Sequence, residues 1–395
     1  MNDEQRRGGV RVERMRASAQ VVSAAVTGRT GRVGSNASLG GRFRNALLAG
    51  PPGLATLAAA GFAPLPKSPP VSVMSEFLFR RGRRKPDAPL PLERPHDTWL
   101  RATETGLRAT WLGHSTVLLE LDGRRVLTDP VFGLRASPSS FMGPKRFHPV
   151  PATLAELPPI DAVLLSHDHY DHLCEPTMRA LAKMRVPIVT ALGVGAHLER
   201  FGVDPARITE LDWHELAVVG GVAFRATPAQ HFSGRGMRDR NRTLWASWVI
   251  QSERRRVFFS GDTGLTPAFA ETGKAYGPFD LVMLEVGAFH PSWATIHLGP
   301  QNALAVFEML GGGTLLPVHW GTFCLALHDW DEPAETLVRL AAERGARVLT
   351  PRLGQAFEPA QMDGPTPWWR EVVRPERRQV DLTAAALRGT PGRTP

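Results

Sequence analysis

The sequence contains only two cysteines, Cys174 and Cys324, in 395 residues. A small secreted domain held by disulfides would need more, so a buried core must stabilise this chain instead. With 43% hydrophobic and 22% charged residues the composition is globular, and the length suffices for one large or two ordinary domains. We expect Cys174 to be a small buried residue.

A long uninterrupted apolar run is also missing. The best candidate, residues 46–66, is broken by Gly50-Pro51-Pro52-Gly53 and by Pro64, whereas a membrane-spanning helix needs about 20 apolar residues in succession. Arg6-Arg7 and the short Ala/Val/Ser run at 15–27 are weak export signals. We expect a cytoplasmic protein, with peripheral membrane contact as one option and export as the minority alternative.

Acidic residues are scarce in the first hundred positions. This part has sixteen Lys or Arg against seven Asp or Glu, which accounts for the whole net charge of +9. Residues 1–70 lack periodicity and predict a basic, disordered arm with a short helix near Ala46. The arm could contact an anionic membrane or nucleic acid, or act only as a solubilising leader.

Three further parts follow the arm. Residues 71–106 predict an extended segment packed on the body, 107–362 a folded body, and 363–395 a polar tail. In the body we expect strands at 108–112, 116–121, 124–128, 162–165, 186–190, near 208 and 216, and at 223–227, 244–251, 256–260, 281–286, 314–318 and 347–349. We expect helices at 175–184, 193–201, 266–276, 300–310 and 333–344. This order predicts an α+β or α/β fold with two sheets and helices outside them.

Residues 166–172 read Ser-His-Asp-His-Tyr-Asp-His and follow the apolar run 162–165, which predicts a buried strand ending at a sheet edge. Neutral imidazole and carboxylate are the usual protein ligands of zinc and similar ions. The pattern offers two ligand sets side by side, His167 with His169 and Asp171 with His172. We interpret it as part of a two-metal site rather than a solvated turn.

Three later residues, His231, Asp262 and His319, each follow a predicted strand. One alone would be an ordinary strand-end residue, but together with the turn they complete a two-metal site. Metals roughly 3.5–4 Å apart can share a hydroxide that attacks phosphorus or a carbonyl carbon, so no Ser or Cys nucleophile is needed.

The motif and its downstream partners resemble the metallo-β-lactamase superfamily over about residues 107–350. Within it the chain is most similar to the N-acylphosphatidylethanolamine-hydrolysing phospholipase D family and its bacterial relatives. Segments 111–116, 128–132, 166–173, 244–248, 258–264 and 319–323 are among those that carry this closer resemblance. The resemblance implies a four-layer αββα sandwich with two mixed sheets.

The resemblance also implies that seven side chains bind two divalent metals, with zinc expected and iron or manganese as alternatives. One metal would be held by His167, His169 and His231, the other by Asp171, His172 and His319, with Asp262 bridging both. Asp171 and His297 are the candidates for handling the proton of the reaction.

These expectations describe a dinuclear hydrolase that uses a metal-bridging hydroxide, most closely a phosphodiesterase acting on a small-molecule or lipid phosphodiester. A lactonase or other ester hydrolase is the alternative, because the ligands do not separate these reactions. A nuclease is less favoured, since the body is near neutral and the 172–231 segment is too short for a nucleic-acid clamp. Oligomeric state stays open, with a homodimer as one option.

The chain departs from its relatives at Cys174, where they commonly have Asp, and at 288–293, where Ala-Phe-His-Pro-Ser-Trp replaces Ala-Tyr-Glu-Pro-Arg-Trp. The substrate is therefore open, and His290 could face the pocket. Other residues have two readings each. His114 and Asp129 either orient metal ligands or anchor the fold. The arginines at 235, 238, 240 and 242 either bind phosphate or form a solvated loop. Trp245 and Trp248 are expected in the core.

Overall fold

The computed structural model describes residues 43–44, 82–236 and 238–372. Apart from residues 43–44, the arm predicted at 1–70, with its short helix near Ala46, lies outside the described residues, as do residues 71–81 and the tail from 373 on. No helix within the described part is long and apolar enough to span a bilayer.

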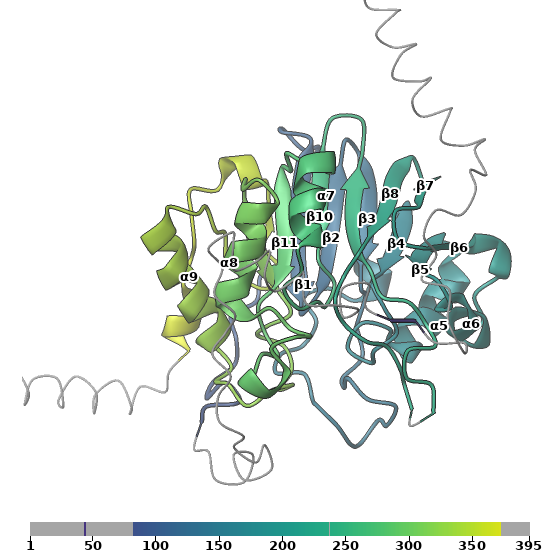
Figure 1. The fold of residues 1–395 in the computed structure, drawn as a ribbon, viewed down its shortest axis with the longest axis horizontal. Coiled ribbons are helices and arrows are strands. Elements are labelled where there is room, and N and C mark those ends of the chain that lie inside the picture. Colours follow the sequence, from purple (N-terminus) through teal and green to yellow (C-terminus); the bar gives the residue numbers. More distant parts are fainter. Residues whose placement is uncertain (1–42, 45–81, 237, 373–395) are drawn as a thin grey trace, which may run out of the picture.

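Two mixed sheets form the middle of the molecule (Figure 1). The seven-stranded sheet has the order β13 (Ala356–Phe357), β1 (Leu107–Gly113), β2 (Thr116–Leu121), β3 (Arg124–Thr128), β4 (Ala162–Leu165), β5 (Ile188–Ala191) and β6 (Ile208–Leu211). The six-stranded sheet has the order β12 (Leu315–Val318), β11 (Leu281–Glu285), β10 (Arg256–Phe259), β9 (Ser247–Gln251), β8 (Val222–Thr227) and β7 (Leu216–Val219). In each sheet antiparallel hairpins continue into parallel strands. The predicted fold class is confirmed.

Helices cover the outer faces of the two sheets. The seven-stranded sheet packs against α5 (Glu175–Met184) and α6 (Gly195–Arg200), and the six-stranded sheet against α7 (Ala268–Tyr276), α8 (Gly299–Met309) and α9 (Glu332–Arg344). A short helix, α4 (His96–Trp99), precedes β1. In Figure 1 the first group is teal and the second runs from green to yellow.

Strand β2 shows why these strands read as continuous apolar runs. Val117, Leu119 and Leu121 point into the cluster between the sheets, whereas Leu118 belongs to the cluster under α5 and α6. Both faces of the strand are therefore buried, and period-2 alternation of polar residues is lost. Trp245 and Trp248 are 1% and 0% exposed, which confirms that they are core residues.

Some predicted boundaries were wrong for tertiary reasons. The strand expected at 244–251 begins at Ser247, because the amides of Leu244 and Ala246 donate to Leu192 and Ser166 outside the sheet. The strand expected at 347–349 is only a single bridge between Val348 and Leu315. Strand β13 was missed because it has two residues.

The residues of the candidate site lie at or after the ends of seven strands. The segments that follow β1, β3, β4, β8, β10, β11 and β12 contact one another at one edge of the sandwich. The carboxyl ends of parallel strands such as β3 and β4, or β10 to β12, meet at the same edge, where loops can carry functional groups.

Candidate metal centre

The turn at 166–172 is fixed to its surroundings by buried hydrogen bonds. The Ser166 amide and hydroxyl both donate to Asp129, at 2.7 and 2.6 Å. The amide of His172 donates to the carbonyl of His169, which tightens the turn. Gly261 lies against the turn with φ +55°, and a Cβ there would be 2.6 Å from the Ser166 Cβ. Glycine therefore lets the Asp262 loop approach the His-rich turn.

The first group of candidate ligands contains the side chains of His167, His169, His231 and Asp262. Nε2 of His167 lies 2.8 Å from Nδ1 of His169, which is 3.2 Å from Nε2 of His231. Asp262 Oδ2 lies 3.9 and 3.8 Å from the Nε2 atoms of His167 and His231. Donors around tetrahedral zinc, with bonds of about 2.0–2.1 Å, are roughly 3.3 Å apart, so this spacing fits one ion.

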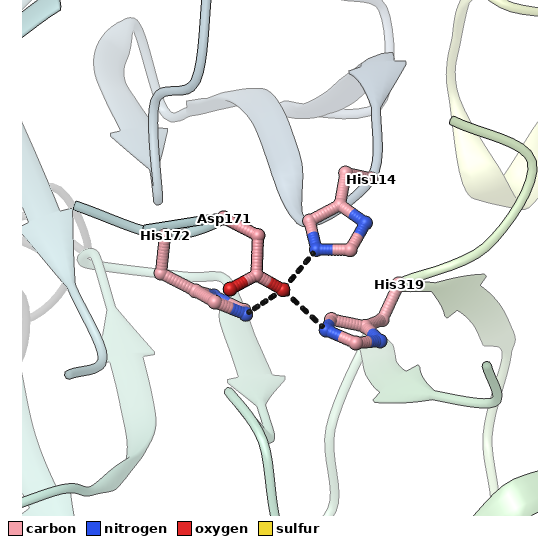
Figure 2. A group of neighbouring side chains, drawn as sticks. All are labelled: His114, Asp171, His172 and His319. Atoms are coloured by element: carbon pink, nitrogen blue, oxygen red, sulfur yellow. Dashed lines mark hydrogen bonds and ion pairs between the residues drawn. The ribbon is translucent and has the colours of Figure 1, made fainter. Parts of the chain in front are cut away.

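The second group, which lies beside the first and is drawn in Figure 2, contains the side chains of His114, Asp171, His172 and His319. Asp171 Oδ2 lies 3.5 Å from Nε2 of His172 and 3.2 Å from Nε2 of His319. Asp262 Oδ2 is 3.2 and 3.1 Å from the same two nitrogens. The carboxylate of Asp262, a member of the first group, thus also contacts two members of the second. All seven predicted ligands are brought together by the structure.

Four buried side-chain atoms at this centre have no hydrogen-bond partner among the described residues: Nδ1 of His114, Nε2 of His172, Oδ1 of Asp262 and Nδ1 of His319. Buried polar atoms are normally paired, because leaving one unsatisfied costs about 1–3 kcal/mol. Nε2 of His172 and Oδ1 of Asp262 belong to predicted ligands, and a metal ion would satisfy this imidazole nitrogen and this carboxylate oxygen together. The residues present therefore fit a metal site.

The protonation preferences of the metal-free groups agree with this interpretation. Burial lowers the pKa of His167 and His231 well below the ordinary histidine value, so both rings are neutral and can bind a metal. Burial opposes ionisation of Asp262, but His172 and His319 hold its pKa well below the ordinary range. Against the effect of burial, Asp262 and Asp171 raise the pKa of His319 to about 10. The carboxylates therefore attract a positive charge to this point.

Neighbouring groups orient the candidate ligands. The Nδ1 of His172 lies 2.6 Å from Asp129, and Nδ1 of His231 lies 2.8 Å from the Ile296 carbonyl oxygen. The Nε2 of His114 lies 3.0 Å from Asp171 (Figure 2). Burial lowers the pKa of His114 to about 3, so its neutral ring donates this hydrogen bond. Asp129 and His114 therefore contact candidate ligands, as residues that orient metal ligands must.

Comparison with known proteins agrees with the geometry. Residues 124–320 match the model of the beta-lactamase superfamily domain. An uncharacterized protein of Mycobacterium tuberculosis is 46% identical over 302 residues, covering 75% of this chain and 80% of its own length. N-acyl-phosphatidylethanolamine-hydrolyzing phospholipase D 1 of Caenorhabditis elegans is 37% identical over 273 residues, covering 65% of this chain and 77% of its own.

The chain belongs to the metallo-β-lactamase superfamily. The solved structure of isothiocyanate hydrolase from Delia radicum gut bacteria aligns with a TM-score of 0.50 at 22% identity, over 64% of this chain and 98% of that one. This likeness supports the superfamily fold alone. Family membership and the His/Asp groups together establish a metal-dependent hydrolase.

Beyond the seven candidate ligands, this superfamily member has a buried carboxylate that the sequence analysis missed. Glu285 ends β11 and is 0% exposed. Its Oε1 accepts from the amides of Thr263 and Leu298, and its Oε2 lies 2.7 Å from Nδ1 of His297. Burial alone would lower the pKa of His297, but the Glu285 carboxylate raises it. An acidic residue closing a buried apolar strand is the pattern that identified Asp262, and it could have identified Glu285.

A cavity of about 290 Å³ opens beside the centre. Its polar wall includes His169, Asp171, Asp262, His297 and His319, and its apolar wall is Phe232, Ala288, Trp293, Ile296 and Leu325. From the altered block at 288–293 the wall takes Ala288 and Trp293, whereas the His290 side chain accepts from the Ser292 amide.

In the loop after His231, the contacts of Arg235 match neither of the predictions, which were a phosphate ligand and a solvated side chain. This guanidinium donates to the carbonyls of Asp168 and Leu173 and lies 4.0 Å from the centre of the Tyr170 ring. Arg235 therefore stabilises the metal-binding turn from outside. The carboxylate of Asp239 in the same loop accepts from the amides of Arg235 and Gly236.

Proposed function

We propose that the protein is a dinuclear metal-dependent phosphodiesterase that resembles the N-acylphosphatidylethanolamine-hydrolysing phospholipase D family. The observation that carries the proposal is the gathering of the six other predicted ligands around the Asp262 carboxylate in two adjacent groups, each with its ligand atoms close enough to hold one ion. The reaction type is supported by the similarity to the Caenorhabditis elegans phospholipase.

The donor set favours zinc, because each group combines imidazole nitrogens with carboxylate oxygen, and iron and manganese accept the same donors. Two such cations lower the pKa of water from about 16 to about 7 and neutralise charge on a phosphate oxygen. In the chain, Asp262 would hold the two sites together, while Asp129 and His114 keep His172 and Asp171 in position.

We propose that His297 donates the proton to the leaving group. Its Nδ1 is engaged by Glu285, and the ring lines the cavity, so Nε2 is the atom left to face a substrate. Asp171 was the other candidate, but His114 and His319 both contact its Oδ2. Burial opposes ionisation of Asp171, yet His172 and these contacts hold its pKa well below the ordinary range. A carboxylate so strongly favoured as an anion is a poor proton donor.

The cavity wall is consistent with a phosphodiester that has an apolar part. Phe232, Trp293 and Leu325 line the same cavity as the candidate ligands, where they would contact an acyl or alkyl group and exclude water. A lipid phosphodiester supplies both the anionic group for the metals and the apolar group for this wall.

A substrate panel tests the proposal. Metal-loaded protein is assayed with bis(p-nitrophenyl) phosphate, an N-acylated phosphatidylethanolamine, simple lactones and single-stranded RNA. We expect turnover of bis(p-nitrophenyl) phosphate and of the N-acylated phosphatidylethanolamine but not of RNA, and loss of this turnover in Asp262→Asn, with the fold verified by circular dichroism. Turnover of lactones but not of phosphodiesters would contradict the proposal and support the lactonase alternative. Full activity of Asp262→Asn would contradict the metal chemistry altogether.

A further inference from the structure

Large apolar side chains are exposed at six positions of the part of the chain that the structure describes, and three of them belong to one loop. This loop, residues 133–145, is part of the connection between β3 and β4. Its Leu134, Phe141 and Met142 are 57%, 77% and 64% exposed. Exposed apolar residues are ordinary when scattered singly, but a group of them indicates an interaction site.

The loop is held in shape by its own polar groups. The Arg135 guanidinium donates to the carbonyls of Ser140 and Gly143, and the Ser139 hydroxyl accepts from the amides of Phe141 and Met142. Phe141 and Met142 are therefore presented to solvent by a defined structure, with little ordering left to occur on binding.

Along the chain on both sides of these apolar residues, the charged residues have one sign. No Asp or Glu occurs between Asp129 and Glu156, whereas Arg135 and the exposed Lys145 flank the apolar tip. An apolar tip bordered by cations complements a bilayer that contains anionic lipid, because the side chains enter the headgroup region while the cations meet phosphates. A protein partner would not require the absence of acidic residues over so long a segment.

The loop is connected to the cavity. Ala136 in the loop belongs to a small buried cluster with Val131, Cys174 and Phe323, against which Leu325 packs. Leu325 also lines the cavity beside the metal centre. In Figure 1 the loop is the blue segment that extends below the sheets. The loop is therefore joined at Ala136, through this cluster, to a residue of the cavity wall.

We propose that the 133–145 loop inserts Phe141 and Met142 into the surface of an anionic phospholipid bilayer and so brings the cavity to a membrane-embedded substrate. The second half of this statement rests on the proposed function. Binding of the loop to the bilayer does not, because it requires no turnover.

Vesicle sedimentation with the full chain tests the loop. The vesicles contain phosphatidylcholine with 30% phosphatidylglycerol, and the partition coefficient is measured at about 0.15 and 0.5 M NaCl. The variant is Phe141→Ser with Met142→Ser, and the control is Leu100→Ser, which removes the most exposed apolar side chain (86%) outside the loop. The basic arm is present in all three proteins, and raising the salt weakens its contribution.

We expect the double variant to bind at least tenfold more weakly at both salt concentrations and Leu100→Ser to stay within twofold of the parent. The melting temperature verifies that the double variant is folded. Parent protein that does not sediment, or a double variant within twofold of it, would overturn the proposal. A change of elution volume in gel filtration with unchanged vesicle binding would assign the loop to a second copy of the chain. Vesicle binding without turnover of any panel substrate would leave the loop proposal supported and the proposed function refuted.

Discussion

Replacing Asp129 by Asn tests how the protein orients a metal ligand without touching the metal. Asp129 is 0% exposed, and its two oxygens accept from the Ser166 amide, the Ser166 hydroxyl and Nδ1 of His172. Asparagine keeps the shape but has one acceptor oxygen. If that oxygen stays on the Ser166 amide, the new NH₂ group faces Nδ1–H of His172, donor against donor. His172 can relieve this only by moving its proton to Nε2, the atom proposed to bind the metal.

The expected magnitude follows from these contacts. Loss of a residue that orients a metal-binding histidine typically costs 10–100-fold in metal affinity, or about 1.4–2.8 kcal/mol. Leaving one buried donor unsatisfied costs a further 1–3 kcal/mol or so in the free energy of unfolding of the metal-free protein. Both effects should appear in the one variant.

Metal affinity is measured by competition with a fluorescent chelator, and stability by urea unfolding of the metal-free protein. Asp161→Asn is the matched control: its carboxylate accepts from the Arg125 amide at 2.8 Å, at the opposite end of β4 from the turn. We expect no change in metal affinity there. Affinity of Asp129→Asn within twofold of the parent would refute the proposal that His172 binds metal through an oriented Nε2.

Three further predictions concern the same centre. Asp262→Asn should purify with less than half of the parent's metal content by elemental analysis, because both ligand groups lose their shared carboxylate; unchanged metal content would refute the bridge. At saturating metal, Glu285→Gln should slow hydrolysis of an alkyl phosphodiester by up to about 10²–10⁴-fold, but hydrolysis of a p-nitrophenyl ester by less than tenfold. Only the alkyl leaving group, which is poor, needs the proton from His297. Equal losses on both substrates would exclude His297 as the acid. Stripping the metals with a chelator should lower the melting temperature, since free metal at a hundred times its Kd contributes about 2.7 kcal/mol; an unchanged melting temperature would contradict binding to the folded state.

The ligand set could be predicted from the sequence because each member carries a local signal. The turn at 166–172 is contiguous, and His231, Asp262 and His319 each follow an apolar strand. The strand ends need only share one sheet edge to meet, and the fold class ensures this. The order of strands and helices predicted two sheets with helices outside them, and the pattern around Trp248 predicted its burial, whereas the mixed-sheet sandwich was implied by the resemblance to the superfamily.

Long-range contacts decided what the sequence did not reveal. Glu285 has a strand-end signal, but its role depends on His297 reaching it across a loop that no periodicity predicts. Arg235 could be read as a phosphate ligand or as a solvated residue, whereas two carbonyls and the Tyr170 ring bind it instead. Likewise, β9 starts at Ser247 because of hydrogen bonds to distant parts of the chain.

The central claim is that two metal ions at the Asp262 centre make this chain a phosphodiesterase. Titrating metal-stripped protein with zinc while following hydrolysis of bis(p-nitrophenyl) phosphate tests it directly. The account predicts that turnover rises with added zinc and reaches its plateau at two equivalents per chain. No turnover at any zinc concentration, or turnover that does not depend on zinc and is not restored by iron or manganese, would contradict it.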